Sequence, residues 1–318
     1  MPQNFTTNPA IEAVLADLEI KRKHISSTQF KGWGAILIGI ATIFVIANFV
    51  GLIIALIIGG GLIGYGGVML YKITEETVIY KSRFKNEVIG ATLKEIDSSL
   101  TIKPSEGITE TEFKHSQLFS TSPDRYFTED LIAGKIDKTS FYFAEVHAEY
   151  KTETQTKNGR KTHWHDILKG IVFAGDFNKH FNGVTIIRPK DFGSSISAWF
   201  SKNIYSFGDK EIVELENGSF NKNFVVYSND QIEARYILTP VLMERINTLN
   251  ERCAYTISLS FINANMYIAF PLAKNYFEPP VFKTLLKPNL LDDDLSVLSF
   301  MYNIVHELHL NTRIWTKA

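Results

Sequence analysis

Histidine pairs are the residues whose type and spacing could bind a metal ion. His163 and His165 flank one tryptophan, so on a β-strand both imidazoles point to the same face. His147, on a neighbouring strand, could complete a three-histidine site of the kind that binds zinc. His306 and His309 are three residues apart, a spacing that places them on one face of a helix. Polar pairs are common on solvated surfaces, so we keep these five histidines as candidates but expect no metal and no cofactor.

A second constellation mixes acids with a base just before a predicted helix. Asp230 or Glu233 together with Arg235 could act as a general acid and base. A helix cap or a structural ion pair explains the same residues, and we favour that interpretation. The aspartates at 292–294 could hold a divalent cation through oxygen ligands. They also precede a predicted helix, where the positive N-terminal end favours negative charge, and we expect them to cap it.

The chain lacks the sequence motifs of several common enzyme classes. It has no glycine-rich loop for phosphate and no Gly-x-Ser-x-Gly elbow. Its one cysteine, Cys253, excludes an internal disulfide, fits a reducing compartment and is expected to be buried. The 33 basic and 34 acidic residues give a net charge of −1, whereas a nucleic-acid-binding protein normally has a basic excess. We therefore expect no catalytic residues and no nucleic-acid partner.

The longest uncharged run extends from Gly32 to Tyr71. A single helix of this length would reach roughly 60 Å, about twice the ~30 Å of hydrocarbon in a bilayer. Asn48 and Gly51 lie near its middle and favour a turn. The run therefore predicts a transmembrane hairpin over residues 32–72, with spans at about 33–47 and 51–71.

The flanks of the hairpin predict its orientation. Lysine and arginine side chains are enriched on the cytoplasmic side of membrane helices, and both flanks are basic, so we expect both termini in the cytoplasm. The residues concerned are Lys21, Arg22, Lys23 and Lys31 before the run and Lys72, Lys81, Arg83 and Lys85 after it.

Small residues in the second span recur every four positions. Gly51, Ala55 and Gly59 form one such series, and Gly60 with Gly64 forms another. Small residues at this spacing let helix backbones approach closely. We expect them to pack the two spans together, with a homo-oligomer as the alternative.

The rest of the chain predicts an α+β fold. Residues 1–31 should form a cytoplasmic arm with one amphipathic helix, and residues 73–137 a helical stalk or connector. From residue 138 the apolar period changes to two, which is typical of strands. We therefore expect a cytoplasmic domain over residues 138–318, with a mainly antiparallel sheet and flanking helices.

An Asn-Gly pair at 158–159 predicts the turn of a β-hairpin in this domain. Cations gather around that turn. If the hairpin faced the membrane, they could contact anionic headgroups, at about 1 kcal/mol for each cation. The residues are Lys157, Arg160 and Lys161.

Several blocks together resemble a known family. They are residues 116–119, 141–145, 170–179, 213–216, 220–227, 230–240 and 310–315. In these blocks the chain resembles a bacterial membrane protein family known as domain of unknown function 3137. The resemblance covers most of the chain, including the arm and both spans. It implies a protein of the bacterial inner membrane with no established activity, and a LemA-like membrane protein as a partner.

These observations favour an uncharacterised inner-membrane protein without enzymatic activity. Its hairpin would be an anchor, and its cytoplasmic domain would bind a protein partner or lipid. Two alternatives stay open. One is a membrane-anchored enzyme, metal-dependent through the histidine pairs, and the other is a structural subunit of a membrane complex.

Overall fold

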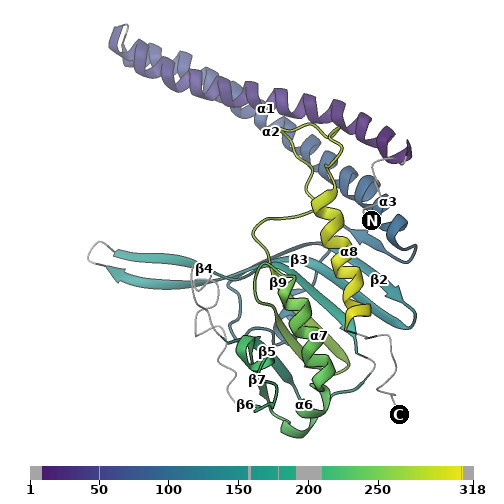
Figure 1. Cartoon of the computed structure of the whole chain (residues 1–318). Coiled ribbons are helices and arrows are strands. Elements are labelled where there is room, and N and C mark those ends of the chain that lie inside the picture. Colours follow the sequence, from purple (N-terminus) through teal and green to yellow (C-terminus); the bar gives the residue numbers. More distant parts are fainter. Residues whose placement is uncertain are drawn as a thin grey trace. The chain divides into compact units, whose positions relative to one another are not determined.

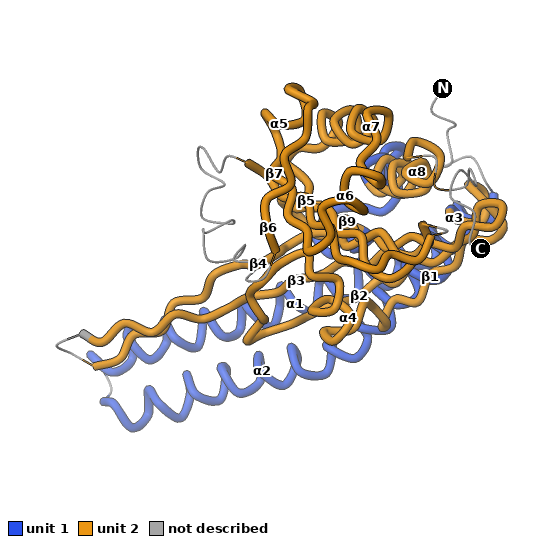
Figure 2. Tube along the Cα trace, turned by 90° about the horizontal axis from the view of Figure 1, so that it is seen from below, with its two compact units in different colours: residues 1–92, 277–293 blue, residues 93–276, 294–318 orange. Residues whose placement is uncertain are grey.

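The computed structural model describes residues 9–49, 51–156, 159–177, 179–190, 210–308 and 310. The chain forms two compact units, coloured separately in Figure 2. The first comprises Met1–Thr92 and Phe277–Asp293, and the second comprises Leu93–Tyr276 and Asp294–Ala318.

Two long helices form most of the first unit (Figure 1). Helix α1 extends over Pro9–Phe49 and α2 over Leu52–Arg83, followed by a π-helical turn, η2, over Phe84–Ile89 and by α3 over Gly90–Ile96. Gly51 lies between α1 and α2 with φ 113°, a conformation that favours glycine. The expected turn is therefore present. The arm and first span, which we expected as separate elements, form one continuous helix.

Both helices are long and apolar enough to cross a membrane. Their most apolar windows are 11% and 17% buried, so these side chains are not the core of the unit. Phe44 is 71% exposed, Ile53 75% and Tyr71 81%. Apolar side chains exposed at this density are typical of a surface that contacts lipid.

Small residues bring α1 and α2 into close contact. A Cβ added to Gly59 would lie 2.6 Å from the Gly39 carbonyl oxygen, and one added to Gly66 would lie 2.5 Å from the Gly32 carbonyl oxygen. Ala55 is completely buried. Of the five residues expected to pack the helices, Ala55 and Gly59 lie in tightly packed positions. Around a Cβ added to Gly51, Gly60 or Gly64 there is no described atom within 4 Å.

The polar end of the helix pair is held by residues 277–293, which we call the strap. Arg22 on α1 donates two hydrogen bonds, of 2.8 and 2.9 Å, to the Glu19 carboxylate and a third to the Val281 carbonyl oxygen. The Leu285 amide donates to Glu19 over 2.9 Å. Arg22 and Glu19 are 9% and 4% exposed. The strap thus completes the hydrogen bonding of a buried ion pair.

A second set of contacts joins the strap to α2 and η2. The Tyr80 hydroxyl donates to the Pro280 carbonyl oxygen over 2.8 Å. The Glu278 carboxylate forms ion pairs with the ammonium groups of Lys81 and Lys85, at N···O distances of 2.7 and 2.6 Å. Burial alone would raise the pKa of Glu278, but the hydrogen bonds from the two lysines outweigh burial and lower it. The strap is therefore attached by charge to both helices.

The described residues of the second unit form a nine-stranded antiparallel sheet, with strand order β1-β2-β3-β4-β9-β8-β5-β7-β6. Its strands are β1 Thr101–Lys103, β2 Arg125–Ile136, β3 Thr139–Thr156, β4 Gly159–Asp176, β5 Thr185–Pro189, β6 Glu211–Ile212, β7 Phe224–Ser228, β8 Ser258–Ile262 and β9 Asn265–Pro271. Its helices are α4 Glu110–His115, α5 Phe220–Asn223, α6 Gln231–Ile237, α7 Pro240–Glu251 and α8 Asp292–Glu307.

The two faces of the sheet carry different partners because successive side chains of a strand alternate. Ala144 and Val146, at even positions of β3, belong to an apolar cluster with Phe113 of α4. Phe141, at an odd position, has its ring 6.2 Å from that of Tyr302 on α8. The odd face of β3 is therefore the face on which α8 packs.

The sequence-based fold class, α+β with a mainly antiparallel sheet, is confirmed. One expectation is wrong: the interval 73–137, expected to be helical, contains β1 and β2. The alternation of β2 is broken by a bulge between Glu129 and Ile132, with Asp130 at φ 59°. This bulge disrupts the two-residue period from which a strand is recognised. The domain division itself remains a prediction.

The hairpin of β3 and β4 is longer than the strands beside it (Figure 1). Strand β2 pairs with β3 as far as Glu149, and β9 pairs with β4 from Gly170. Among the described residues, 150–156 and 159–165 therefore pair only with each other. We call this two-stranded segment the ribbon.

Candidate functional site

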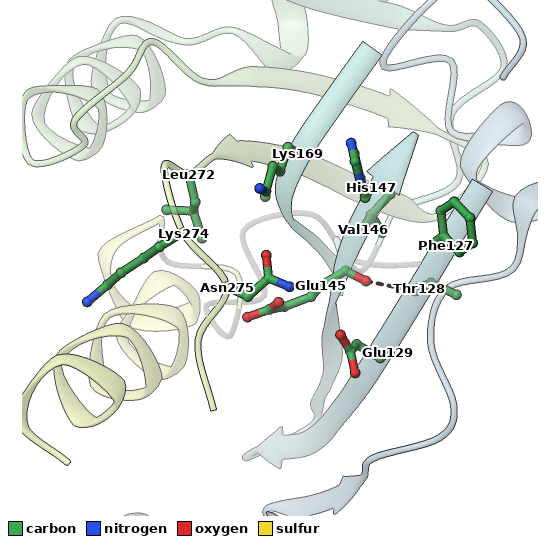
Figure 3. A pocket seen from close by; sticks show the side chains of 11 residues that line it. Phe127, Thr128, Glu129, Glu145, Val146, His147, Lys169, Leu272, Lys274 and Asn275 are labelled. Carbon is green, nitrogen blue, oxygen red and sulfur yellow. Dashed lines mark hydrogen bonds between the residues drawn. The ribbon is translucent and has the colours of Figure 1, made fainter. Parts of the chain in front are cut away.

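A cavity of about 290 Å³ opens on the odd face of the sheet, where β2, β3 and β4 meet the segment after β9 (Figure 3). The sheet register explains its lining. Phe127 lies opposite His147, and Glu129 lies opposite Glu145. His147 in turn lies opposite Lys169 on β4. Directly opposed residues share a face, so these side chains converge on one surface.

Glu145 is a buried, hydrogen-bonded charged group of this cavity. Its side chain accepts a 2.6 Å hydrogen bond from the Tyr276 amide, and its carbonyl oxygen accepts one of 2.9 Å from Thr128. Glu145 is 8% exposed. Figure 3 shows Lys274 and Asn275 on the segment that follows β9. The cavity therefore presents carboxylates, lysines and an amide together, a lining suited to a polar ligand with groups of both charges.

Next to the cavity, His147 belongs to a cluster that could hold a metal ion. Its Nε2 atom lies 2.7 Å from Oδ1 of Asp166. Glu149 supplies a further carboxylate, and the ligand atoms of the three residues lie within 4.8 Å of one another. A second cluster, Glu129, Asp130 and Glu145, is purely acidic.

The three-histidine arrangement considered from the sequence does not form. His165 lies opposite Tyr150 and His163 opposite Thr152, both at even positions of β3, while His147 is at an odd position. His165 approaches the Thr152 hydroxyl at 2.8 Å and stacks on the Tyr150 ring, with 5.1 Å between ring centroids. The pair therefore lies on the face of the ribbon opposite to His147.

The second histidine pair is described only in part. His306 lies near the C-terminal end of α8, with its ring 6.1 Å from Tyr302. His309 lies outside the described residues. Of the hairpin-tip cations, Arg160 pairs with Glu153 at 2.9 Å and Lys161 is exposed opposite Thr154. Lys157 also lies outside the described residues.

The acid and base residues near 230 have structural contacts. Asp230 caps α6 by accepting from the amides of Ile232 and Glu233. The Glu233 carboxylate accepts from the Asn182 and Gly183 amides, at 3.2 and 2.8 Å. Arg235 donates to the Gln231 carbonyl oxygen over 3.1 Å. The aspartates at 292–294 begin α8.

Cys253 lines a second cavity of about 230 Å³, together with Phe270, Phe300 and Met301. The thiol donates to the Leu249 carbonyl oxygen over 3.3 Å. Burial raises the pKa of the Cys253 thiol to about 12. At neutral pH the group is therefore a protonated thiol, which is a poor nucleophile.

The sequence reasoning missed Glu145, Glu149, Asp166 and Lys169. His147 and Glu149 are two apart on a predicted strand, so their common face was readable. The position of Asp166 could not be predicted from the sequence, because β4 has one extra residue, Ile167, between the pairs Ala148–Leu168 and Glu149–Asp166. This bulge turns Asp166 onto the face of Lys169, three residues away, where simple alternation would place it on the opposite face.

Comparison with solved structures finds one neighbour to report. It is the crystal structure of the mycobacterial trehalose monomycolate transport factor A, TtfA, with 12% identity and a TM-score of 0.40. The match covers 72% of this chain and 94% of the other. The two chains are too dissimilar for the role of TtfA to say anything about this protein. No curated protein matches the chain.

Comparison with family models gives a match over residues 166–310, to a family described as "Protein of unknown function (DUF3137)". The matched segment begins in β4, at the Asp166 of the cluster, and includes the remaining strands, the strap and α8. The resemblance expected from the sequence is therefore confirmed over residues 166–310, the part of the chain that matches the DUF3137 model.

Proposed function

We propose that this protein is an integral protein of the bacterial cytoplasmic membrane whose cytoplasmic domain binds a protein partner. Its hairpin would cross the bilayer twice and leave both termini in the cytoplasm. The observation that carries the anchor is the exposed apolar surface of α1 and α2. Outside a bilayer, side chains such as Phe44 and Ile53 would remain in water, which costs about 1.5–3 kcal/mol for each large apolar residue.

The ribbon supports a protein partner rather than lipid. A two-stranded segment is marginally stable alone, and each of its outer edges presents backbone amide and carbonyl groups. An extended segment of another protein can add to such an edge as a further strand. In contrast, the tip cation Arg160 is already paired with Glu153, so a lipid headgroup would have to compete with an internal carboxylate.

In-cell photo-cross-linking tests the partner. A photoreactive residue at Thr154 in the ribbon should give a discrete cross-linked product, while the same residue at exposed Thr248 on α7 should not. Replacing residues 151–164 by Asn-Gly joins the paired residues Tyr150 and His165 by a two-residue turn. This shortening should abolish partner recovery while the protein stays in the membrane. Cross-links to lipid alone, or equal products from both sites, would refute the partner.

Reporter fusions test the anchor separately. Reporters at Met1 and at Ala318 should both be active only as cytoplasmic fusions. A periplasmic signal from either end would overturn the proposed orientation, and extraction of the full chain by carbonate would overturn the membrane insertion. The metal-dependent enzyme and the structural subunit predict different results: turnover by the purified protein in the first case, and a fixed stoichiometric complex in the second.

A further inference from the structure

We propose that His147, Glu149 and Asp166 form a binding site for a divalent transition-metal ion of the Zn²⁺ class. This triad differs from the histidine sets considered from the sequence, and it is independent of the proposed partner binding. Its basis is the placement of one imidazole and two carboxylates on one face of the sheet, where β3 and β4 leave the sheet to form the ribbon.

The backbone brings the three groups together. His147 and Glu149 are two residues apart on β3 and therefore share a face. Asp166 joins them because the β4 bulge places it opposite Glu149. Backbone pairing fixes all three Cα positions, since the residues belong to two strands of an antiparallel ladder. A ligand set on strands is held more firmly than one on a loop.

The distances fit a metal ion. Zn²⁺ binds imidazole nitrogen and carboxylate oxygen at about 2.0–2.2 Å, so the ligand atoms of a tetrahedral ion lie roughly 3.3–3.6 Å from one another. The three ligand atoms lie within 4.8 Å of one another, and the His147 nitrogen and Asp166 oxygen are 2.7 Å apart. An ion would replace the hydrogen bond between His147 and Asp166, and rotation of the two side chains would have to increase the separation of these atoms by roughly 0.6–0.9 Å.

The charges also fit a cation. Two carboxylates and one imidazole are ligands that transition metals accept, and the mixed nitrogen and oxygen set favours Zn²⁺ over Mg²⁺ or Ca²⁺. Their exposure is intermediate, so an ion can enter from solvent. His147 also lines the 290 Å³ cavity. Three protein ligands leave one position of a tetrahedral ion for water or for a ligand.

A cation that already approaches one of the three ligands competes with the ion. Arg125 on β2 lies opposite Glu149, with its guanidinium 3.9 Å from the carboxylate. The Arg125 guanidinium carbon lies 3.5 Å from the centre of the Trp164 ring, which holds it in place. Replacing Arg125 by a neutral residue should release Glu149 for the ion. We therefore expect one substitution to strengthen metal binding, whereas substitutions of the ligands should weaken it.

Zn²⁺ titration of the full chain in detergent, followed by calorimetry, tests the site. We expect one ion for each chain. His147→Gln and Asp166→Asn should each weaken binding at least about tenfold, the loss typical even for indirect ligand-supporting groups. His165→Gln is the matched control, because it changes a histidine of the same β3–β4 hairpin on the other face, and it should leave the affinity unchanged. Arg125→Gln should strengthen binding a few-fold.

Other results would overturn the proposal. They are failure of the wild-type chain to bind Zn²⁺, unchanged binding by a folded Asp166→Asn variant, or equal losses from His147→Gln and His165→Gln. An affinity that Arg125→Gln leaves unchanged or lowers would exclude Glu149 as a ligand and with it the three-residue site. Circular dichroism of each variant separates lost binding from lost folding. If His147→Gln fails to fold, Asp166→Asn and Arg125→Gln still decide the question.

Discussion

The two ends of the α1–α2 pair are held together by different physical means. At the apolar end, glycines let the backbones approach, as at Gly39 and Gly59, and no charged side chain takes part. At the polar end, the buried Glu19–Arg22 pair and the Glu278 cluster bind a strap from near the C-terminus. Lipid accepts apolar side chains but cannot hydrate a charged group. Water hydrates charged groups but disfavours exposed apolar surface. Each end therefore uses the contacts that its expected surroundings allow.

Replacing Arg22 is the largest expected perturbation of this contrast. Arg22→Met leaves Glu19 buried without its bidentate partner, and breaking a buried pair from one side costs about 3–5 kcal/mol. Hydrogen exchange at the Leu285 amide, which donates to Glu19, should accelerate accordingly. Lys23→Met, on the exposed side of the same helix, is the control and should leave exchange unchanged. Equal exchange in both variants would mean that the strap is held by other contacts.

Enlarging a contact glycine should separate the apolar end. A Cβ at Gly59 would lie 2.3 Å from Ile43 Cγ1 and 2.6 Å from a backbone oxygen, so Gly59→Leu overpacks the contact, at about 1–3 kcal/mol. Gly60→Leu is the matched neighbour, where a Cβ meets no described atom within 4 Å. Unfolding measured in mixed detergent micelles should show a lower free energy of unfolding only for the Gly59 variant. Similar losses in both would place a further contact at Gly60.

The two lysines that pair with Glu278 should contribute differently to the free energy of unfolding. Lys85 has a side chain 5% exposed, against 44% for Lys81. Lys85→Met removes a buried charge-assisted hydrogen bond, worth about 1.5–3 kcal/mol, from a carboxylate that retains its other partner. Lys81→Met removes a contact on the solvent side and should cost under about 1 kcal/mol. Thermal unfolding of the purified chain measures both, and the reverse order would contradict the burial argument.

Of these perturbations, lowering the pH should reduce the stability of the polar end of the helix pair the least. The hydrogen bond from Arg22 lowers the pKa of Glu19 from 4.5 to about 2. A lowered folded-state pKa contributes stability that is complete above the unfolded value and is lost as the pH falls towards the folded one. Between pH 7 and pH 4 the loss should stay below about 1 kcal/mol. Glu19→Gln should remove this part of the pH dependence, and a titration identical to wild type would exclude Glu19 as its source.

Much of the fold could be read from the sequence because its signals are local. The uncharged run predicted the helix pair, and the Asn-Gly pair predicted the β3–β4 hairpin, whose Gly159 has φ 117°. Strand β2 was not predicted, because its bulge breaks the two-residue alternation of apolar and polar side chains. The candidate site was less readable. Asp166 joins His147 through a one-residue shift in pairing between strands, and no property of either strand alone records that shift.

The strap also fixes an order of events during synthesis. Glu19 and Leu285 are 266 residues apart, so at about 5–20 residues per second a ribosome needs roughly 15 to 50 s to extend from one to the other. The α1–α2 pair emerges early in that interval, when no strap yet exists. The nascent chain must therefore tolerate a hydrated Glu19–Arg22 surface, and it closes that end of the helix pair only after all the described strands of the sheet, which end at Pro271, have emerged.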